Sequence, residues 1–212
     1  MFPFADRGPA ALHSNVADFF MPWINAQEHT YIFHYKINTG VSHFEYWSGS
    51  GNRVPCGTGI WMVEHGSPAQ ARHLFLAHSA ADILCFCHFS PDWLVTSGQV
   101  AFAALGICVT SNQVSFLKAR FLNARIHTLF DVEIAGKVTD CKTALWLAGK
   151  DAQFLAEGDL LKVRYRRTDF NIPASAISLS RFEKATGLRS GIRTHKPKEG
   201  FDSYYSFYLN TL

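Results

Sequence analysis

The chain has 212 residues, 48% of them hydrophobic, and a formal net charge of +3. This length allows one large or two small globular domains, and no linker rich in Gly, Ser or Pro divides the middle of the chain. A charge of +3 is too small to indicate nucleic-acid binding by itself. Residues 1–6 lack the basic start and apolar run of a signal peptide, so we expect a cytoplasmic protein.

The cysteines argue against a disulfide framework and against a structural zinc site. Their number is odd, and none of them has the C-x-x-C spacing of a zinc ligand pair. Free cysteine is usually buried in folded proteins. We therefore expect free, buried thiols and neither a metal nor another cofactor; the residues are Cys56, Cys85, Cys87, Cys108 and Cys141.

The segment 71–89 is the best helix candidate. Its apolar residues cover every face rather than one stripe, which is typical of a buried helix. Ser67-Pro68 offers a start with a first-turn proline, and Ser90-Pro91 offers a stop. A membrane span is excluded because ionisable groups are costly in hydrocarbon, and this segment contains His73, His78, Asp82 and His88.

The region from Gly106 to about Arg167 has the pattern of successive β-strands. Leu161, Val163 and Tyr165, for example, alternate with charged residues, which predicts one apolar and one polar face. Short connections between such strands imply an antiparallel meander. The predicted strands are 106–111, 114–122, 130–136, 142–148, 153–157 and 161–167.

These segments together resemble a known family. A strand region at 29–47, the helix with "HSAADILCF", and the strands "VSFLKARFLNARIHTLFDVEIAGKV" and "FLAEGDLLKVRY" resemble the hotdog fold of acyl-thioester enzymes. The resemblance covers residues 28–167. It implies an α+β protein in which an antiparallel β-sheet is wrapped around a long central helix.

The resemblance also divides the chain. We expect an N-terminal extension at 1–25, a hotdog domain at 26–170 and a C-terminal extension at 171–212. In the last of these, residues 174–184 could form one short helix. The aromatic segment 201–212 could add a strand or cover a pocket.

In hotdog enzymes the thioester carbonyl lies near the N-terminus of the central helix, where free backbone N–H groups polarise it. His78 and Asp82 stand four residues apart, so on a helix they share a face and can interact. We expect a catalytic role for at least one of them; the alternative is a buried polar pair bonded to backbone. His65 lies in the loop where dehydratase-type hotdogs carry a catalytic histidine, although it could equally be an ordinary surface histidine.

Substrate contacts are predicted at two places. Trp61, Phe75 and Phe86 could line an acyl tunnel, or could simply be core. Arg164 and Arg166 could bind the phosphates of coenzyme A or of a carrier-protein arm, or could simply solvate a surface. Nucleic acid is a weaker alternative, because no stacking motif accompanies these charges.

Three functions follow from the resemblance. The first is a thioesterase that hydrolyses an acyl-CoA or acyl-carrier-protein thioester. The second is a 3-hydroxyacyl thioester dehydratase, with His65 as base and Asp82 as acid. The third is a non-catalytic acyl-binding hotdog module. In each case we expect a homodimer or higher homo-oligomer without nucleic-acid binding or membrane insertion.

Overall fold

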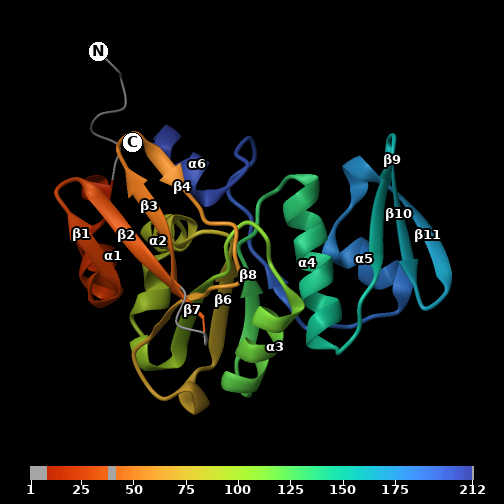
Figure 1. Ribbon diagram of the computed structural model, residues 1–212, viewed down its shortest axis with the longest axis horizontal. Helices are drawn as coiled ribbons and strands as arrows, with labels where there is room; N and C mark the ends of the chain where they lie inside the picture. The colour runs from red at the N-terminus through yellow and green to blue at the C-terminus, as the bar shows by residue number, and fades with distance from the viewer. Residues whose placement is uncertain (1–8, 38–41, 212) are drawn as a thin grey trace.

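The computed structural model describes residues 9–37 and 42–211. These residues form three β-sheets with helices between and around them (Figure 1). A five-stranded sheet lies at the centre, and a four-stranded sheet lies on one side of it. On the other side the helix α4 (Ile134–Leu147) separates the central sheet from a three-stranded sheet (Figure 1).

The central sheet has the order β12-β8-β6-β7-β5. Strands β8, β6 and β7 run parallel, β12 is parallel to β8, and β5 is antiparallel to β7. The helix α2 (Ala80–Phe89) connects β6 to β7, and α3 (Ser111–Arg120) connects β7 to β8. The strands are β5 (Trp61–Glu64), β6 (His73–Ala77), β7 (Val100–Ala104), β8 (Arg125–Thr128) and β12 (Arg193–Thr194).

Strand β6 is buried on both faces, as expected for a parallel strand covered by helices on each side. Phe75 and Ala77 face one core cluster, with residues of α1 (Ser14–Phe20), α2 and α6 (Tyr204–Thr211). Leu74 and Leu76 face a second cluster, which includes Leu117 of α3. The chain therefore crosses over one face between β6 and β7 and over the other between β7 and β8.

The four-stranded sheet is an antiparallel meander, and it confirms the strands expected at 29–47. Phe33, Tyr35 and Trp47 are fully buried and join the same core cluster as α2. Its strands are β1 (Ile24–Gln27), β2 (Thr30–Lys36), β3 (Ser42–Ser48) and β4 (Gly51–Arg53).

The three-stranded sheet is also antiparallel and has a core of its own. Leu161, Val163 and Tyr165 point inward, which confirms the alternation predicted for this strand. They pack with residues of α4 and α5 (Leu179–Thr186). The strands are β9 (Gln153–Glu157), β10 (Leu160–Tyr165) and β11 (Thr168–Pro173).

Short 3₁₀ helices complete the secondary structure. They are η1 (Pro9–Ala11), η2 (Met21–Trp23), η3 (Pro68–Gln70), η4 (Pro91–Leu94), η5 (Ser97–Gln99) and η6 (Ala174–Ala176). Within the described part of the chain, no helix combines the length and the apolar character needed to cross a membrane.

The single helix predicted over 71–89 is wrong. Residues His73–Ala77 form the buried strand β6, and the helix begins only at Ala80. A run that is apolar on all sides suits a buried parallel strand as well as a buried helix, so its periodicity does not separate the two. The boundary is marked by Ser79, whose side chain accepts a hydrogen bond from the N–H of Asp82 as an N-cap.

All four strands predicted between 106 and 148 are also wrong. The strand β7 ends at Ala104, the segment 114–122 lies mainly in α3, and 142–148 lies almost entirely in α4. The segment 130–136 contains most of the connection after β8 and the first three residues of α4. The protein is a mixed α and β protein, as expected, but a hotdog sheet around one long central helix is not shown; α4, with 14 residues, is longer than the other described helices.

Two predictions for the C-terminal part can be checked. The short helix expected within 174–184 exists as α5, displaced by a few residues. The aromatic segment forms the helix α6 rather than a strand, and α6 packs against α2.

Candidate functional site

The topology of the central sheet directs attention to one crevice. The connection after β6 leads to one side and the connection after β8 leads to the other. In open α/β sheets, ligands bind at the carboxyl ends of the strands where such connections diverge. Here this point lies between the residues that follow β6 and those that follow β8.

A cavity of about 410 Å³ lies at this point. It is lined by residues that follow β6 and β8, by the first turns of α4, and by the segment that leads into α6. Its ionisable lining residues are His78, Asp82, Asp131, Glu133, Asp202 and Tyr205. We call this cavity the acidic pocket, because four of its lining residues are carboxylates in a chain whose overall charge is positive.

His78 lies directly after β6 and has a defined tautomer. Its Nδ1 is 3.1 Å from the carbonyl oxygen of Gly106, and a carbonyl can only accept, so Nδ1 carries the hydrogen. Burial lowers the pKa of His78 from its ordinary value of 6.5. At neutral pH the imidazole is therefore uncharged, with Nε2 as an acceptor.

Asp82, in the first turn of α2, is buried and fully bonded. The hydroxyl of Ser79 donates to its Oδ2 at 2.7 Å, and the N–H of Tyr205 donates to its Oδ1 at 2.8 Å. Burial raises the pKa of Asp82 above its ordinary value. Asp82 thus ties α6 to α2 at the wall of the pocket. His78 lines the same wall, but it precedes α2, so the two residues do not share a helix face as the sequence predicted.

Asp131 and Glu133 lie in the connection between the end of β8 and the start of α4. No hydrogen bond to the Asp131 carboxylate is found in the described part of the chain. Burial, reinforced by the negative charges of Asp82, Glu133 and Asp202, raises the pKa of Asp131 to about 7, although Lys196 opposes the shift. This carboxylate is therefore half-buried, free of side-chain partners, and close to its protonation midpoint at neutral pH.

The N-terminus of α4 opens beside these carboxylates. Glu133 precedes the helix without a side-chain cap bond, and Ala135 of the first turn lines the acidic pocket. Among the described residues no acceptor is found for the N–H groups of Ile134, Ala135 and Gly136. Free first-turn amides at the positive end of a helix favour a bound anion.

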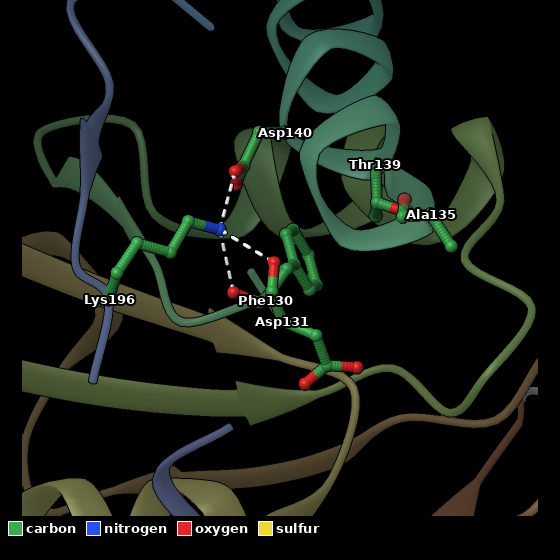
Figure 2. A network of polar contacts seen from close by, with 6 residues as sticks. All are labelled: Phe130, Asp131, Ala135, Thr139, Asp140 and Lys196. Atoms are coloured by element: carbon green, nitrogen blue, oxygen red, sulfur yellow. Dashed lines mark hydrogen bonds and ion pairs between the residues drawn. The ribbon is translucent and has the colours of Figure 1, made fainter. Parts of the chain in front are cut away.

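The turn between β8 and α4 is held by two unusual residues. Gly136 is needed because a Cβ there would overlap the backbone of Asp131, lying 2.7 Å from its nitrogen and closer still to its oxygen. Lys196 donates to the carbonyl oxygens of Phe130 at 2.7 Å and Asp131 at 3.0 Å, and to Oδ2 of Asp140 at 2.8 Å. Figure 2 shows these three bonds, with the Asp131 carboxylate pointing away from the ammonium group.

The N-terminus of α2, in contrast, is closed to ligands. The fully buried carboxylate of Glu45, from β3, accepts hydrogen bonds from the N–H groups of Ala80 at 2.8 Å and Ala81 at 3.1 Å. The N–H of Asp82 is bonded to Ser79. The expectation that free amides of this helix polarise a thioester carbonyl is therefore wrong, because the Glu45 side-chain oxygens already accept their hydrogen bonds.

The remaining predicted catalytic residue lies elsewhere. His65 follows β5, and His78 follows β6. Because β5 runs antiparallel to β7 and β7 runs parallel to β6, the two histidines lie at opposite ends of the sheet along the strand direction. Its ring packs against Phe19 and Trp23, with ring centroids 4.1 and 4.5 Å apart. The structure does not bring His65 together with His78 and Asp82.

The predicted substrate contacts are not gathered at the acidic pocket either. Phe75 and Phe86 are buried in the core around α2. Trp61 is 2% exposed and donates its indole N–H to the carbonyl of Trp23. Arg164 lies on β10 of the three-stranded sheet and pairs with Asp169, and Arg166 follows β10 in the turn to β11.

A larger groove of about 880 Å³ runs beside Trp61, Trp23 and Phe116. Its ionisable lining residues are His34, Lys36 and Glu64. Glu64 is already paired with Arg120, and in the described part of the chain no hydrogen bond joins these three side chains to one another. We therefore regard the smaller acidic pocket as the candidate site.

Sequence reasoning missed Asp131, Glu133, Glu45 and Lys196. A usable signal existed for Asp131, because a carboxylate directly after the apolar run Leu129-Phe130 is typical of a strand that ends at a site. The alternation of Phe130, Val132 and Ile134 with Asp131 and Glu133, however, favours a strand with these two carboxylates on its polar face. Within residues 9–37 and 42–211, no three His, Cys, Asp or Glu side chains form a group that could hold a metal ion.

Comparisons with known proteins add little to this geometry. No family model and no curated protein matches the chain. Among solved structures, the chain is similar to one chain of a complex described as the bacteriophage T7 lagging-strand DNA polymerase interacting with primase domains of two gp4 subunits bound to an RNA/DNA hybrid and dTTP. The identity is 13%, the TM-score is 0.42, and the match covers 65% of this chain and 71% of that chain. A similarity of this size carries no conclusion about function.

Proposed function

We propose that the acidic pocket binds a divalent cation, with Mg²⁺ as the natural choice, and acts on a phosphate ester. The observation that carries the proposal is the position of Asp131 and Glu133 at the carboxyl end of the parallel strand β8, beside the free N-terminus of α4. Mg²⁺ prefers carboxylate oxygens, and proteins usually supply one or two of them while water and substrate phosphates complete the shell. The two carboxylates of Asp131 and Glu133 are therefore enough protein ligands for a Mg²⁺ site.

The electrostatics of the pocket support the same proposal. Burial, together with the charges of the neighbouring carboxylates, holds the pKa of Asp131 near 7, and a bound cation would offset both the burial and the repulsion. An anionic substrate would be repelled by Asp82, Asp131 and Glu133 unless a cation lay between them. A bound Mg²⁺ would neutralise charge on the phosphate in the transition state.

The chain's own residues have distinct parts in this proposal. Asp131 and Glu133 would hold the cation, and the free amides of α4 would orient phosphate oxygens. His78, neutral and with Nε2 as acceptor, would take the proton from the attacking water or hydroxyl. Asp82 would position the wall that carries His78 without touching the substrate, since both its oxygens are already bonded.

Mn²⁺ is a suitable probe of the cation site, because its free concentration can be followed by electron paramagnetic resonance and Mg²⁺ can compete with it. We expect one Mn²⁺ per chain, displaced by Mg²⁺. Asp131→Asn and Glu133→Gln should each weaken binding at least about tenfold, as loss of a charged ligand does. Glu157→Gln, an exposed carboxylate on β9, is the matched control and should bind as wild type. Unchanged binding in both pocket variants would end the proposal.

Hydrolysis of an acyl thioester is the second candidate, because His78 and Asp82 both line the pocket. The two functions separate in one assay series with bis(p-nitrophenyl) phosphate and with a panel of acyl-CoAs. Nitrophenolate release that depends on Mg²⁺ or Mn²⁺ supports phosphate-ester chemistry. Metal-independent release of free thiol, lost in Asp82→Asn, supports thioester hydrolysis instead.

A further inference from the structure

Two of the five cysteines differ from the expectation that all are buried. Cys85, Cys87 and Cys141 are buried, but Cys56 and Cys108 are exposed. Cys56 follows β4 and Cys108 follows β7. The two residues are 52 positions apart in the sequence. Their Sγ atoms nevertheless lie 2.6 Å apart.

The backbone brings these two thiols together. The N–H of Ile107 donates to the carbonyl oxygen of Pro55 at 3.0 Å. Gly106 has a φ of +79°, and a Cβ at this position would lie 2.7 Å from the same oxygen. The glycine therefore permits both the turn and the close approach, and the residues next to Pro55 and Ile107 are Cys56 and Cys108.

The two joined segments form part of the wall of the acidic pocket. Val54 and Ile107 both line it. The carbonyl of Gly106 also accepts the hydrogen bond that fixes the tautomer of His78. A covalent link between the segments would therefore hold the wall that carries His78.

We propose that Cys56 and Cys108 are a redox-modification site, at which a reversible disulfide joins residues 54–57 to residues 106–108 at the rim of the acidic pocket. The oxidant belongs to the class of small disulfides such as oxidised glutathione. Intracellular disulfides of this kind are usually transient and redox-sensing, which fits two exposed thiols.

The chemistry is a thiol–disulfide exchange in two steps. The thiolate of Cys56 attacks one sulfur of oxidised glutathione, forms a mixed disulfide and releases one glutathione thiolate. Cys108 then loses its proton and attacks Sγ of Cys56, which releases the second glutathione. Two protein thiols are oxidised and one glutathione disulfide is reduced to two thiols. The hydrogen bond with Cys56 raises the pKa of Cys108. The same exchange with the two cysteines interchanged gives the same disulfide and the same two glutathione thiols.

The test uses the full chain, equilibrated with oxidised and reduced glutathione in varied ratio, quenched with acid and alkylated after denaturation. We expect oxidation to remove two of the five alkylatable thiols, and peptide mass spectrometry to find one linked pair containing Cys56 and Cys108. Dithiothreitol should restore both thiols. In hydrogen exchange, amides of residues 105–110 should exchange more slowly in the oxidised protein.

The single variants Cys56→Ser and Cys108→Ser are controls for each other. Each leaves one exposed thiol, so each should take up one glutathione and form no internal link. The proposal fails if the oxidised wild type carries one glutathione on each cysteine, if the link joins two copies of the chain, or if both thiols remain fully alkylatable. Because no readout involves metal or turnover, these outcomes are independent of the proposed function.

Discussion

The ammonium group of Lys196 lies 2.8 Å from Oδ2 of Asp140, and this ion pair joins two segments that are 56 positions apart in sequence. Asp140 is on α4 and is almost completely buried, whereas the side chain of Lys196 is 26% exposed. The same ammonium binds both carbonyls of the turn that carries Asp131. The ammonium group of Lys196 therefore holds α4 and the β8–α4 turn together.

Replacing Lys196 by Met should destabilise the protein by about 3 kcal/mol, because removal of one partner leaves a buried charge without compensation. Urea unfolding at pH 7 measures the loss. The double variant Lys196→Met with Asp140→Asn should recover part of it. If Lys196→Met alone unfolds within 0.5 kcal/mol of wild type, a threshold typical of neutral surface changes, the ion pair is not structural.

Gly136→Ala should destabilise by about 2 kcal/mol or more, because the added Cβ would overlap the backbone of Asp131 and that backbone cannot move freely. Gly98→Ala is the matched control, since a Cβ at Gly98 meets nothing within 4 Å. Thermal unfolding of the two variants gives the comparison. Equal melting temperatures would show that the β8–α4 turn has more room than its geometry indicates.

Glu45→Ala should cost about 3 kcal/mol at pH 5, because it leaves the N–H groups of Ala80 and Ala81 and the hydroxyl of Tyr35 without their acceptor. Burial raises the pKa of Glu45 from 4.5 to about 7. A raised carboxyl pKa means that the unfolded chain loses its proton first, so wild-type stability falls as the pH rises from about 4.5 to about 7. The stability of Glu45→Ala does not have this pH dependence. The difference in the free energy of unfolding between wild type and Glu45→Ala should therefore be smaller at pH 8 than at pH 5. A deficit that grows with pH would contradict the assignment.

Cation binding should depend on pH through Asp131. The carboxylate must lose its proton to bind, and its pKa is about 7 in the free protein. Affinity for Mn²⁺ should therefore be about tenfold weaker at pH 6 than at pH 8, and nearly constant above pH 8. Asp131→Asn should remove this dependence, while Glu157→Gln should retain it. A flat profile in wild type would exclude Asp131 as a ligand.

Because of His127, on β8, the free energy of unfolding should fall at acidic pH. His127 is fully buried between His73 and His195, with nitrogen–nitrogen distances of 3.0 and 2.8 Å. Burial, with the charges of His195 and His73, lowers its pKa to about 3. The unfolded chain thus takes up a proton first, and stability should fall by on the order of 3 kcal/mol as the pH drops from 7 to 4.

The comparison for His127 is His127→Gln, whose urea-unfolding free energy should vary less between pH 7 and pH 4. The exposed His34 provides a matched control, because His34→Gln should keep the wild-type dependence. Identical slopes for wild type and His127→Gln would place the acid sensitivity elsewhere.

Local patterns predicted some elements well and others poorly, for identifiable reasons. Strand β10 has one buried face, so alternation at Leu161, Val163 and Tyr165 was visible in the sequence. Strand β6 is buried on both faces, and its apolar run merges with that of α2. Two N-cap patterns could have separated strand from helix: Ser79-x-x-Asp82 before α2, and Thr110-x-x-Gln113, which forms a capping box before α3.

The candidate site was predictable only in part. His78 and Asp82 were found because ionisable groups in an apolar run are conspicuous. Asp131 and Glu133 lie 49 and 51 residues beyond Asp82, and only the parallel pairing of β6 with β8 brings them to the same pocket. Glu45 is a residue of a four-stranded meander, and nothing in its local sequence indicates that it reaches the start of α2.

The route of the chain sets an order for its assembly during synthesis. The strands β6, β7 and β8 have all emerged before the three-stranded sheet is made, yet Lys196, Asp202 and the N–H group of Tyr205 come after it. A nascent chain that ends before α6 therefore holds the central strands but lacks part of the pocket wall. Ribosome-bound intermediates of this protein should be compact but should lack a complete acidic pocket until that last helix is released.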